Sequence, residues 1–196
     1  MSELKRVCVF CGSSPGVRPG YAAAAREMGT RLAERGIGVV YGGGKVGLMG
    51  VVADAAMAAG GEVIGVIPEG LMAREVGHAG VTELRVVRTM HERKALMAEL
   101  SDAFVALPGG FGTWEEYFEV LTWAQLGIHP KPCGLLNVEG YYGALLAMMD
   151  HAATEGFVRP EHRASVLEAA EPARMLELLA AFRAPAVPRW LSLDET

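Results

Sequence analysis

Short apolar runs alternate with longer amphipathic stretches along the whole chain. The runs have the length of strands buried on both faces, and they predict strands at Arg6–Phe10, Val39–Tyr41, Glu62–Ile67, Leu84–Val87, Ala103–Leu107, Cys133–Leu136 and Ser165–Leu167. The stretches between them predict six helices. Four span Tyr21–Arg35, Met90–Leu100, Tyr141–Glu155 and Pro172–Phe182, one follows Gly47 and ends at about Ala59, and one follows the loop that begins at Pro108. This alternation predicts an α/β fold: a Rossmann-like, doubly wound, mostly parallel sheet with helices on both faces. We expect one domain over residues 1–183 and a C-terminal tail over 184–196.

One glycine-rich loop lies between a predicted buried strand and a predicted helix. Pro108-Gly109-Gly110 follows the strand, and helical spacing then relates Trp114, Tyr117, Phe118 and Leu121. Backbone N–H groups of such a loop can approach an anion, and the N-terminus of the helix adds favourable partial charge. Glu115 and Glu116 are expected in the first turn of that helix, facing the bound group. The segment therefore predicts a phosphate site beside an acidic group.

Thr113 and Glu116 also have the spacing of a capping box, in which the two side chains satisfy N–H groups at a helix start. A cap alone needs neither the proline nor the three glycines that precede Thr113. We therefore favour a ligand-binding loop over a purely structural one.

A second glycine-rich segment formally fits a dinucleotide-binding motif. Gly42, Gly44 and Gly47 have the spacing Gly-x-Gly-x-x-Gly. That motif usually follows the first strand, and an acidic residue should close the second strand about twenty positions later. Glu62 stands at that separation but opens a strand, which argues against NAD. We expect these glycines to let the backbone approach a ligand or a neighbouring helix closely.

The spacing places one charged residue, Arg93, on the apolar stripe of its predicted helix. Leu96, Met97 and Leu100 follow it at i+3, i+4 and i+7. A guanidinium on a buried stripe needs an anionic partner, and either a structural carboxylate or a ligand would serve. His91 lies off the stripe and is expected at the surface.

Composition narrows the possible functions. The chain has 196 residues, of which 51% are hydrophobic, with a net charge of −5. No apolar run approaches the ~18 residues of a membrane span, and the N-terminal run is too short for a signal peptide. We therefore expect a cytoplasmic protein with no membrane partner. Lys and Arg form no long run, so we expect no nucleic-acid partner.

The three cysteines invite a redox or zinc interpretation, because Cys8 and Cys11 form a Cys-x-x-Cys motif. Both lie in or at the end of a predicted strand, whereas a redox pair usually opens a helix, and no second ligand pair follows. Buried thiols are the better interpretation for these two and for Cys133. The histidines show no metal-ligand spacing. We expect no metal and no cofactor.

Two motifs in order along the chain point to one family. They are Pro-Gly-Gly-x-Gly-Thr-x-x-Glu at 108–116 and Met-His-x-Arg-Lys at 90–94, with shorter matches at 11–14, 41–44, 47–50 and 122–129. Together they resemble the Lonely Guy (LOG) family of cytokinin riboside 5′-monophosphate phosphoribohydrolases, long misannotated as lysine decarboxylases. The resemblance covers the chain from about Val7 to Phe182.

The resemblance implies hydrolysis of the N-glycosidic bond of adenosine 5′-monophosphates, with or without an N6 substituent, to free base and ribose 5-phosphate. It implies Arg93 and Glu116 as the catalytic pair. It also implies a homodimer with active sites near the subunit interface. Whether adenine or an N6-prenylated adenine is preferred stays open, as does the individual role of Arg93. The implied substrate-binding positions are Glu75, Arg93, Lys94, Gly110, Phe111, Gly112, Thr113, Trp114, Glu115, Glu116 and Thr122.

Elementary chemistry agrees with that implication. Cleavage of a ribosyl C–N bond builds positive charge on the sugar, as glycoside hydrolysis does. A carboxylate such as that of Glu116 can stabilise this charge and orient or deprotonate water.

Three other classes of function are possible for such a chain. A non-catalytic nucleotide or cofactor carrier on the same fold is the main alternative, and the presence of both Arg93 and Glu116 disfavours it. A pyridoxal-phosphate decarboxylase needs a Schiff-base lysine, but the resemblance already assigns Lys94, one of only four lysines. A single-stranded-DNA binder is disfavoured by the net charge and by the lack of interleaved aromatic and basic residues.

Overall fold

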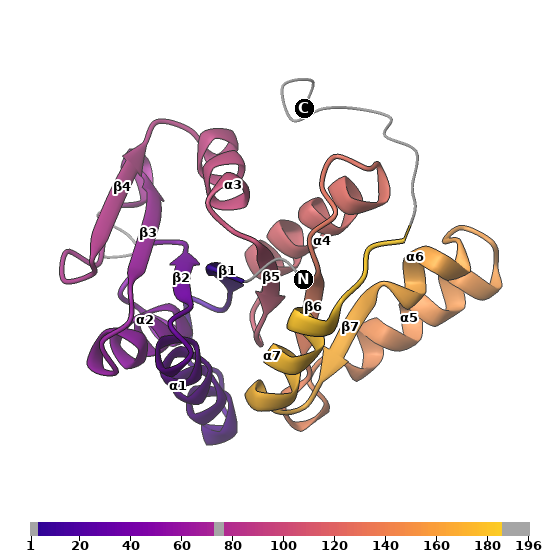
Figure 1. Ribbon diagram of the computed structural model, residues 1–196, viewed down its shortest axis with the longest axis horizontal. Coiled ribbons are helices and arrows are strands. Elements are labelled where there is room, and N and C mark those ends of the chain that lie inside the picture. Colours follow the sequence, from indigo (N-terminus) through magenta and orange to yellow (C-terminus); the bar gives the residue numbers. More distant parts are fainter. Residues whose placement is uncertain (1–3, 73–76, 186–196) are drawn as a thin grey trace.

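Seven parallel strands form one sheet in the computed structural model, which describes residues 4–72 and 77–185. The strand order is β4-β3-β2-β1-β5-β6-β7, from left to right in Figure 1. All neighbouring strands pair in parallel, so the predicted Rossmann-like α/β fold is confirmed. The strands are β1 (Arg6–Phe10), β2 (Gly38–Tyr41), β3 (Val63–Pro68), β4 (Glu83–Val87), β5 (Ala103–Ala106), β6 (Cys133–Leu136) and β7 (Val166–Ala169).

Helices cover both faces of the sheet, as Figure 1 shows. The buried side chains of α1 (Pro19–Glu34), α2 (Gly47–Ala58) and α7 (Pro172–Ala181) share one hydrophobic cluster. Those of α3 (Met90–Glu99), α4 (Phe111–Gln125) and α5 (Gly143–Thr154) share the other. The sheet is therefore doubly wound. The remaining elements are short: α6 (Pro160–Ala164), η1 (Glu69–Leu71) and η2 (Val138–Gly140).

The central strand β1 explains why its sequence is a continuous apolar run. Val7 and Val9 pack in the cluster that contains α1 and α2, whereas Cys8 and Phe10 pack in the cluster that contains α3 and α4. All four side chains are buried. Since β2 and β5 cover both of its edges, β1 has no solvent-facing side.

The three cysteines are free and buried, which confirms their interpretation as core thiols. Burial raises the pKa of the Cys133 thiol to about 12. Burial also raises the pKa values of Cys8 and Cys11, with a smaller contribution from the negative charge of Glu116. A buried thiol that stays protonated is a poor nucleophile and a poor metal ligand.

The strand order reverses between β1 and β5. From β1 the chain adds β2, β3 and β4 on one side and then returns to β5 on the other. The loops after β1 and β5 therefore leave the carboxyl edge of the sheet side by side, where α/β folds bind ligands. The amide of Gly12 donates to the carbonyl of Pro108 at 3.0 Å and ties the two loops together.

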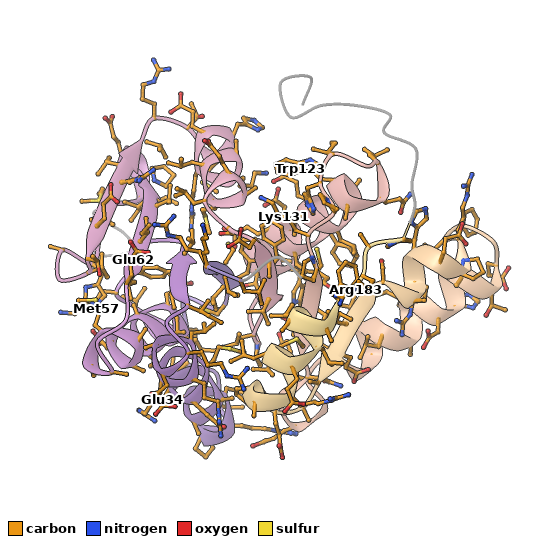
Figure 2. The ribbon with its side chains drawn as sticks, in the orientation of Figure 1. Glu34, Met57, Glu62, Trp123, Lys131 and Arg183 are labelled. Carbon is orange, nitrogen blue, oxygen red and sulfur yellow. The ribbon has the colours of Figure 1, made fainter. Side chains whose placement is uncertain are left out.

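Gly42, directly after β2, allows the close approach of a side chain from a neighbouring helix. A Cβ atom on Gly42 would lie 2.1 Å from Nη2 of Arg93, so only glycine leaves room for the guanidinium. Glu62, labelled in Figure 2, forms an ion pair of 2.8 Å with Arg6. Both residues lie at the amino ends of strands, at the edge opposite the glycine-rich loops. This placement agrees with the argument against a dinucleotide.

The boundaries of the longer elements lie within a few residues of the predicted ones. Helix α6 was not predicted, because its five residues are too short to show helical periodicity. The domain boundary at residue 183 stays a prediction, and residues 186–196 of the expected tail lie outside the described residues. Within the described part of the chain, no helix is long and apolar enough to cross a membrane.

Candidate active site

A cavity of about 320 Å³ opens at the carboxyl edge where the strand order reverses. The loop Gly12–Gly16 forms one side of it, and Pro108–Gly110 forms the other. Tyr21, Leu48 and Tyr141 complete the lining. The cavity thus lies where the reversal predicts a ligand, and its walls are mainly backbone and small side chains.

Helix α4 begins earlier than the sequence suggested. Gly110 is its N-cap residue, with extended dihedral angles, and no side chain caps the helix. The proposed capping box of Thr113 and Glu116 is therefore wrong, because Thr113 already lies inside the first turn. Glu115 and Glu116 consequently lie in the second turn, not the first.

The start of α4 presents backbone donors that lack an intrahelical partner. The first helical bond of α4 runs from the amide of Trp114 to the carbonyl of Gly110, at 3.1 Å. The amides of Phe111, Gly112 and Thr113 precede it and have no intrahelical acceptor. Cβ atoms on Gly110 and Gly112 would meet nothing within 4 Å. The helix start therefore combines N–H donors with open space, as an anion site requires.

Gly109 packs the loop onto its own helix and onto the neighbouring loop. A Cβ atom on Gly109 would lie 2.2 Å from Oγ1 of Thr113 and 2.9 Å from the amide nitrogen of Gly12. The buried Thr113 side chain thus lies beneath the loop. Packing beneath the loop therefore accounts for a threonine at this position, and no role in capping the helix is needed.

Arg93 meets Glu116 inside the protein. Nη2 of Arg93 lies 3.5 Å from Oε1 of Glu116, and the two side chains are only 6% and 12% exposed. Nη2 also donates to the carbonyl of Gly42 at 3.2 Å. The guanidinium expected on the apolar stripe therefore has a carboxylate partner. Its Nε atom is buried without a hydrogen-bond partner among the described residues.

Lys94 is held between two carboxylates of α4. Its ammonium lies 2.5 Å from Oε1 of Glu115 and 2.9 Å from Oε1 of Glu119. Burial lowers the pKa of Lys94, but the hydrogen bonds to both carboxylates outweigh burial and raise the pKa overall. Arg93 and Lys94, adjacent residues of α3, thus both form ion pairs with carboxylates of α4.

Glu116 lies close to the end of β1. Its negative charge contributes, after burial, to the raised pKa values of both Cys8 and Cys11. The carboxylate is thus near the strand end from which the loop Gly12–Gly16 departs, beside the reversal of strand order.

The other predicted site residues are more scattered. Phe111 is 84% exposed at the helix start and packs edge-on against the half-buried Trp114, with ring centres 5.3 Å apart. Thr122 lies two to three turns further along α4 and bonds to the carbonyl of Phe118. It lines another, largely apolar cavity of about 420 Å³. Glu75 lies outside the described residues.

Two serines and two tyrosines, Tyr21 and Tyr141, line the cavity but were absent from the predicted site. Ser13 and Ser14 are exposed in the loop after β1, and Tyr141 approaches from the segment after β6. The serines could have been found, because their loop also follows a strand at the carboxyl edge. Tyr141 carries no local motif and could not.

The cavity offers little for a metal or a Schiff base. Among residues 4–72 and 77–185, no group of three or more His, Cys, Asp or Glu side chains could hold a metal ion. Lys94, the lysine next to Arg93, is occupied by its two ion pairs. The expectation of a cofactor-free site stays a prediction.

Comparison with known proteins identifies the family. The family model described as possible lysine decarboxylase matches residues 49–179. Cytokinin riboside 5′-monophosphate phosphoribohydrolase LOG1 of Arabidopsis thaliana is 54% identical over 178 residues, which cover 91% of this chain and 84% of LOG1. The probable phosphoribohydrolase LOGL9 of Oryza sativa subsp. japonica is 60% identical over 162 residues, or 83% of this chain and 71% of LOGL9. The chain belongs to the LOG family.

Solved structures share the fold of this LOG family member at low identity. A molybdenum cofactor binding protein of Rippkaea orientalis has a TM-score of 0.69 and 22% identity over 92% of this chain and 98% of that chain. DNA processing protein A of Helicobacter pylori has a TM-score of 0.57 and 14% identity, over 89% and 80% of the two chains. At these identities the likeness concerns the fold alone.

The packing around Gly109 gives a direct test of how the loops are joined. Substitution Gly109→Ala should force Thr113 or Gly12 to move, and overpacking of this kind costs about 1–3 kcal/mol. We expect the melting temperature to fall by about 2–10 °C. Gly112→Ala is the matched control, because its Cβ meets open space and alanine favours a helix. Equal melting temperatures for both variants would contradict the packing described here.

Proposed function

We propose that this protein hydrolyses the N-glycosidic bond of adenosine 5′-monophosphates, with or without an N6 substituent, releasing the base and ribose 5-phosphate. The observation that carries the proposal is the nearly buried Arg93–Glu116 pair, whose carboxylate belongs to the same helix, α4, that begins with N–H groups lacking intrahelical partners. The names of relatives at 54–60% identity support the same reaction.

In this proposal the 5′-phosphate binds the amides at the start of α4. The helix dipole and several convergent N–H groups stabilise a dianion there. The open space above Gly110 and Gly112 lets phosphate oxygens approach the backbone. The exposed hydroxyls of Ser13 and Ser14 face the same cavity and can donate from its other side.

Glu116 acts on the sugar in this proposal. Positive charge develops on the ribose ring as the C–N bond breaks, and an adjacent carboxylate stabilises it. The same carboxylate can accept a proton from the attacking water. Because Glu116 is only 12% exposed, its charge is weakly screened by solvent and acts strongly on the ring.

Arg93 holds Glu116 in place. The guanidinium gives the nearly buried carboxylate a charged partner, which offsets part of the cost of removing its charge from water. The bond from Arg93 to the carbonyl of Gly42 fixes the guanidinium from behind. Its buried Nε–H has no partner among the described residues.

Lys94 has a different part in this proposal from the one the resemblance implied. Its two short ion pairs with Glu115 and Glu119 leave it poorly placed to bind phosphate. We assign it to holding α3 against α4, so that Arg93 stays opposite Glu116. Binding roles for Glu75, Trp114 and Thr122 stay predictions.

The substrate class is tested by comparing AMP with adenosine. We expect AMP to be cleaved to adenine and ribose 5-phosphate, because the N–H groups of α4 bind the phosphate and fix the sugar relative to Glu116. Adenosine lacks that anchor and should be cleaved far more slowly. Chromatographic separation of the products measures both, and isopentenyladenosine monophosphate in parallel reports the preferred base. Comparable turnover of AMP and adenosine would overturn the phosphate assignment.

The role of Glu116 is tested by Glu116→Gln. The amide keeps nearly the same shape but has no charge and cannot act as a base, so kcat should fall by about 10²–10⁴. The melting temperature should also fall, since Arg93 loses its charged partner in a buried setting. Circular dichroism and AMP binding establish that the variant is folded.

Glu115→Gln is the matched comparison for that experiment. Glu115 is half exposed and pairs with Lys94 instead of Arg93, so we expect a much smaller loss of kcat. A dead Glu115→Gln beside an active Glu116→Gln would show that the two roles are reversed. Near-normal hydrolysis by both variants would show that neither carboxylate is the catalytic group, whereas a wild-type protein that binds AMP without cleaving it would favour the carrier alternative.

The expected homodimer and cytoplasmic location belong to the same proposal. Met90 of α3 and Phe111 and Phe118 of α4 expose large apolar side chains, as a surface covered by a second subunit would. Light scattering at micromolar concentration should therefore give twice the mass of the 20.8 kDa chain. A monomer would contradict the dimer without affecting the assignment of Glu116.

A further inference from the structure

The segment after β6 supports the glycine-rich loop from outside. The phenol of Tyr141 donates to the carbonyl of Gly109, and the phenol of Tyr142 donates to the carbonyl of Leu107 at 2.6 Å. Two adjacent tyrosines, more than thirty residues away in the sequence, thus hold two carbonyls of the same loop. The predicted set of site residues includes neither of them.

The two hydrogen bonds act on peptide units of different kinds. The carbonyl of Gly109 shares its planar trans peptide with the amide of Gly110, and the C=O and N–H of such a unit point in opposite directions. A donor that fixes the Gly109 carbonyl therefore also fixes the direction of the Gly110 N–H. The carbonyl of Leu107 precedes Pro108, which has no N–H. The bond from Tyr142 therefore secures the backbone but orients no donor.

The Gly110 amide is well placed to serve a ligand. It belongs to the N-cap residue of α4 and lines the cavity at the carboxyl edge. Its carbonyl already accepts from Trp114, so the position of this residue is fixed on both sides. A Cβ atom there would meet nothing within 4 Å, so space is open beside it.

Tyr141 itself is held firmly. Its ring packs edge-on against Tyr21, at 5.6 Å, and against Tyr142, at 4.9 Å. The amide of Tyr142 donates to Oδ1 of Asn137 at 2.7 Å, which closes the turn after β6. Glu139 within this turn has a φ of 50°, an uncommon conformation for a residue other than glycine. A phenol held in this way can impose a direction on the glycine-rich loop.

We propose that Tyr141 is a positioning residue for the substrate phosphate: its hydrogen bond to the Gly109 carbonyl turns the Gly110 N–H toward the phosphate. The inference rests on the proposed function, because it assumes a phosphate at the start of α4. Tyr141 acts through the backbone, and its own phenolic proton is used on Gly109. Its contribution therefore concerns binding of the phosphate and leaves the bond-breaking step to Glu116.

The test is Tyr141→Phe, which removes the hydroxyl and keeps the ring. We expect the KM for AMP to rise about 3- to 10-fold, the range for one oriented hydrogen bond, with kcat within about twofold of wild type. The inhibition constants of ribose 5-phosphate and inorganic phosphate should rise by a similar factor. Inhibition by adenosine, which has no phosphate, should not change. A merely structural role would affect ligands with and without phosphate alike.

Tyr142→Phe is the matched control. It also removes one phenol bonded to a loop carbonyl, and this phenol is fully buried, so the melting temperature should fall at least as far as for Tyr141→Phe. The KM for AMP should nevertheless stay at the wild-type value when each variant is assayed well below its melting temperature. An equal rise of KM in both variants would overturn the specific role of Tyr141.

Failure of the inference can be distinguished from failure of the proposed function. Calorimetric titration with AMP measures phosphate binding whether or not hydrolysis follows. An unchanged AMP affinity and KM in Tyr141→Phe overturns the inference while wild-type hydrolysis upholds the function. Weakened AMP binding by Tyr141→Phe, in a protein whose wild type hydrolyses no nucleotide, upholds the inference and overturns the enzymatic function.

Discussion

The reversal of strand order beside β1 is the constraint on which the site depends. The connections from β1 to β2 and from β5 to β6 run in opposite directions along the sheet. Because such connections are right-handed, the loops after β1 and β5 must separate over opposite faces of the sheet. The helices that follow them, α1 and α4, pack in different hydrophobic clusters. The hydrogen bond from Gly12 to Pro108 and the missing Cβ of Gly109 bring the two loops together at their base. The cavity above that junction therefore results from the order of the strands, and it does not depend on any particular side chain.

Burial of charge is the second determinant. Arg93 and Glu116 come from helices on the same face of the sheet, and each is nearly removed from solvent. Removing either partner would leave a buried charge without compensation, which is strongly unfavourable. The pair therefore fixes how α3 approaches α4, and the glycine at position 42 admits the guanidinium to that junction. A carboxylate held by such a pair is positioned before any substrate arrives, as the proposed role of Glu116 requires.

The sequence predicted the strands and the fold well, because a parallel sheet buried on both faces produces uninterrupted apolar runs. It also predicted that Arg93 needs an anionic partner, since its place on the apolar stripe is a local property. The predicted start of α4 was wrong because Gly112, in the first turn, has low intrinsic helix propensity, and the packing of Thr113 under Gly109 overrides that preference.

The partners of Lys94 and Tyr141 could not be predicted, for a different reason. Lys94 meets Glu115 and Glu119 across two helices, and the phenol of Tyr141 meets a carbonyl 32 residues away. Neither contact leaves a periodic or spaced pattern in the sequence. Such contacts depend on how neighbouring elements are placed by the sheet, which a local motif does not encode.

The charges around Glu116 also explain why backbone and side chains must divide the work in the proposed reaction. Arg93 and Lys94 face three carboxylates, those of Glu115, Glu116 and Glu119, so the cluster carries more negative than positive charge. Such a cluster would repel a phosphate but would stabilise a sugar that becomes positively charged. The phosphate must then be bound by donors outside this cluster, in a turn that contains no acidic residue. The amides at the start of α4 meet that requirement, and their direction matters all the more because none of them can move as a lysine side chain could.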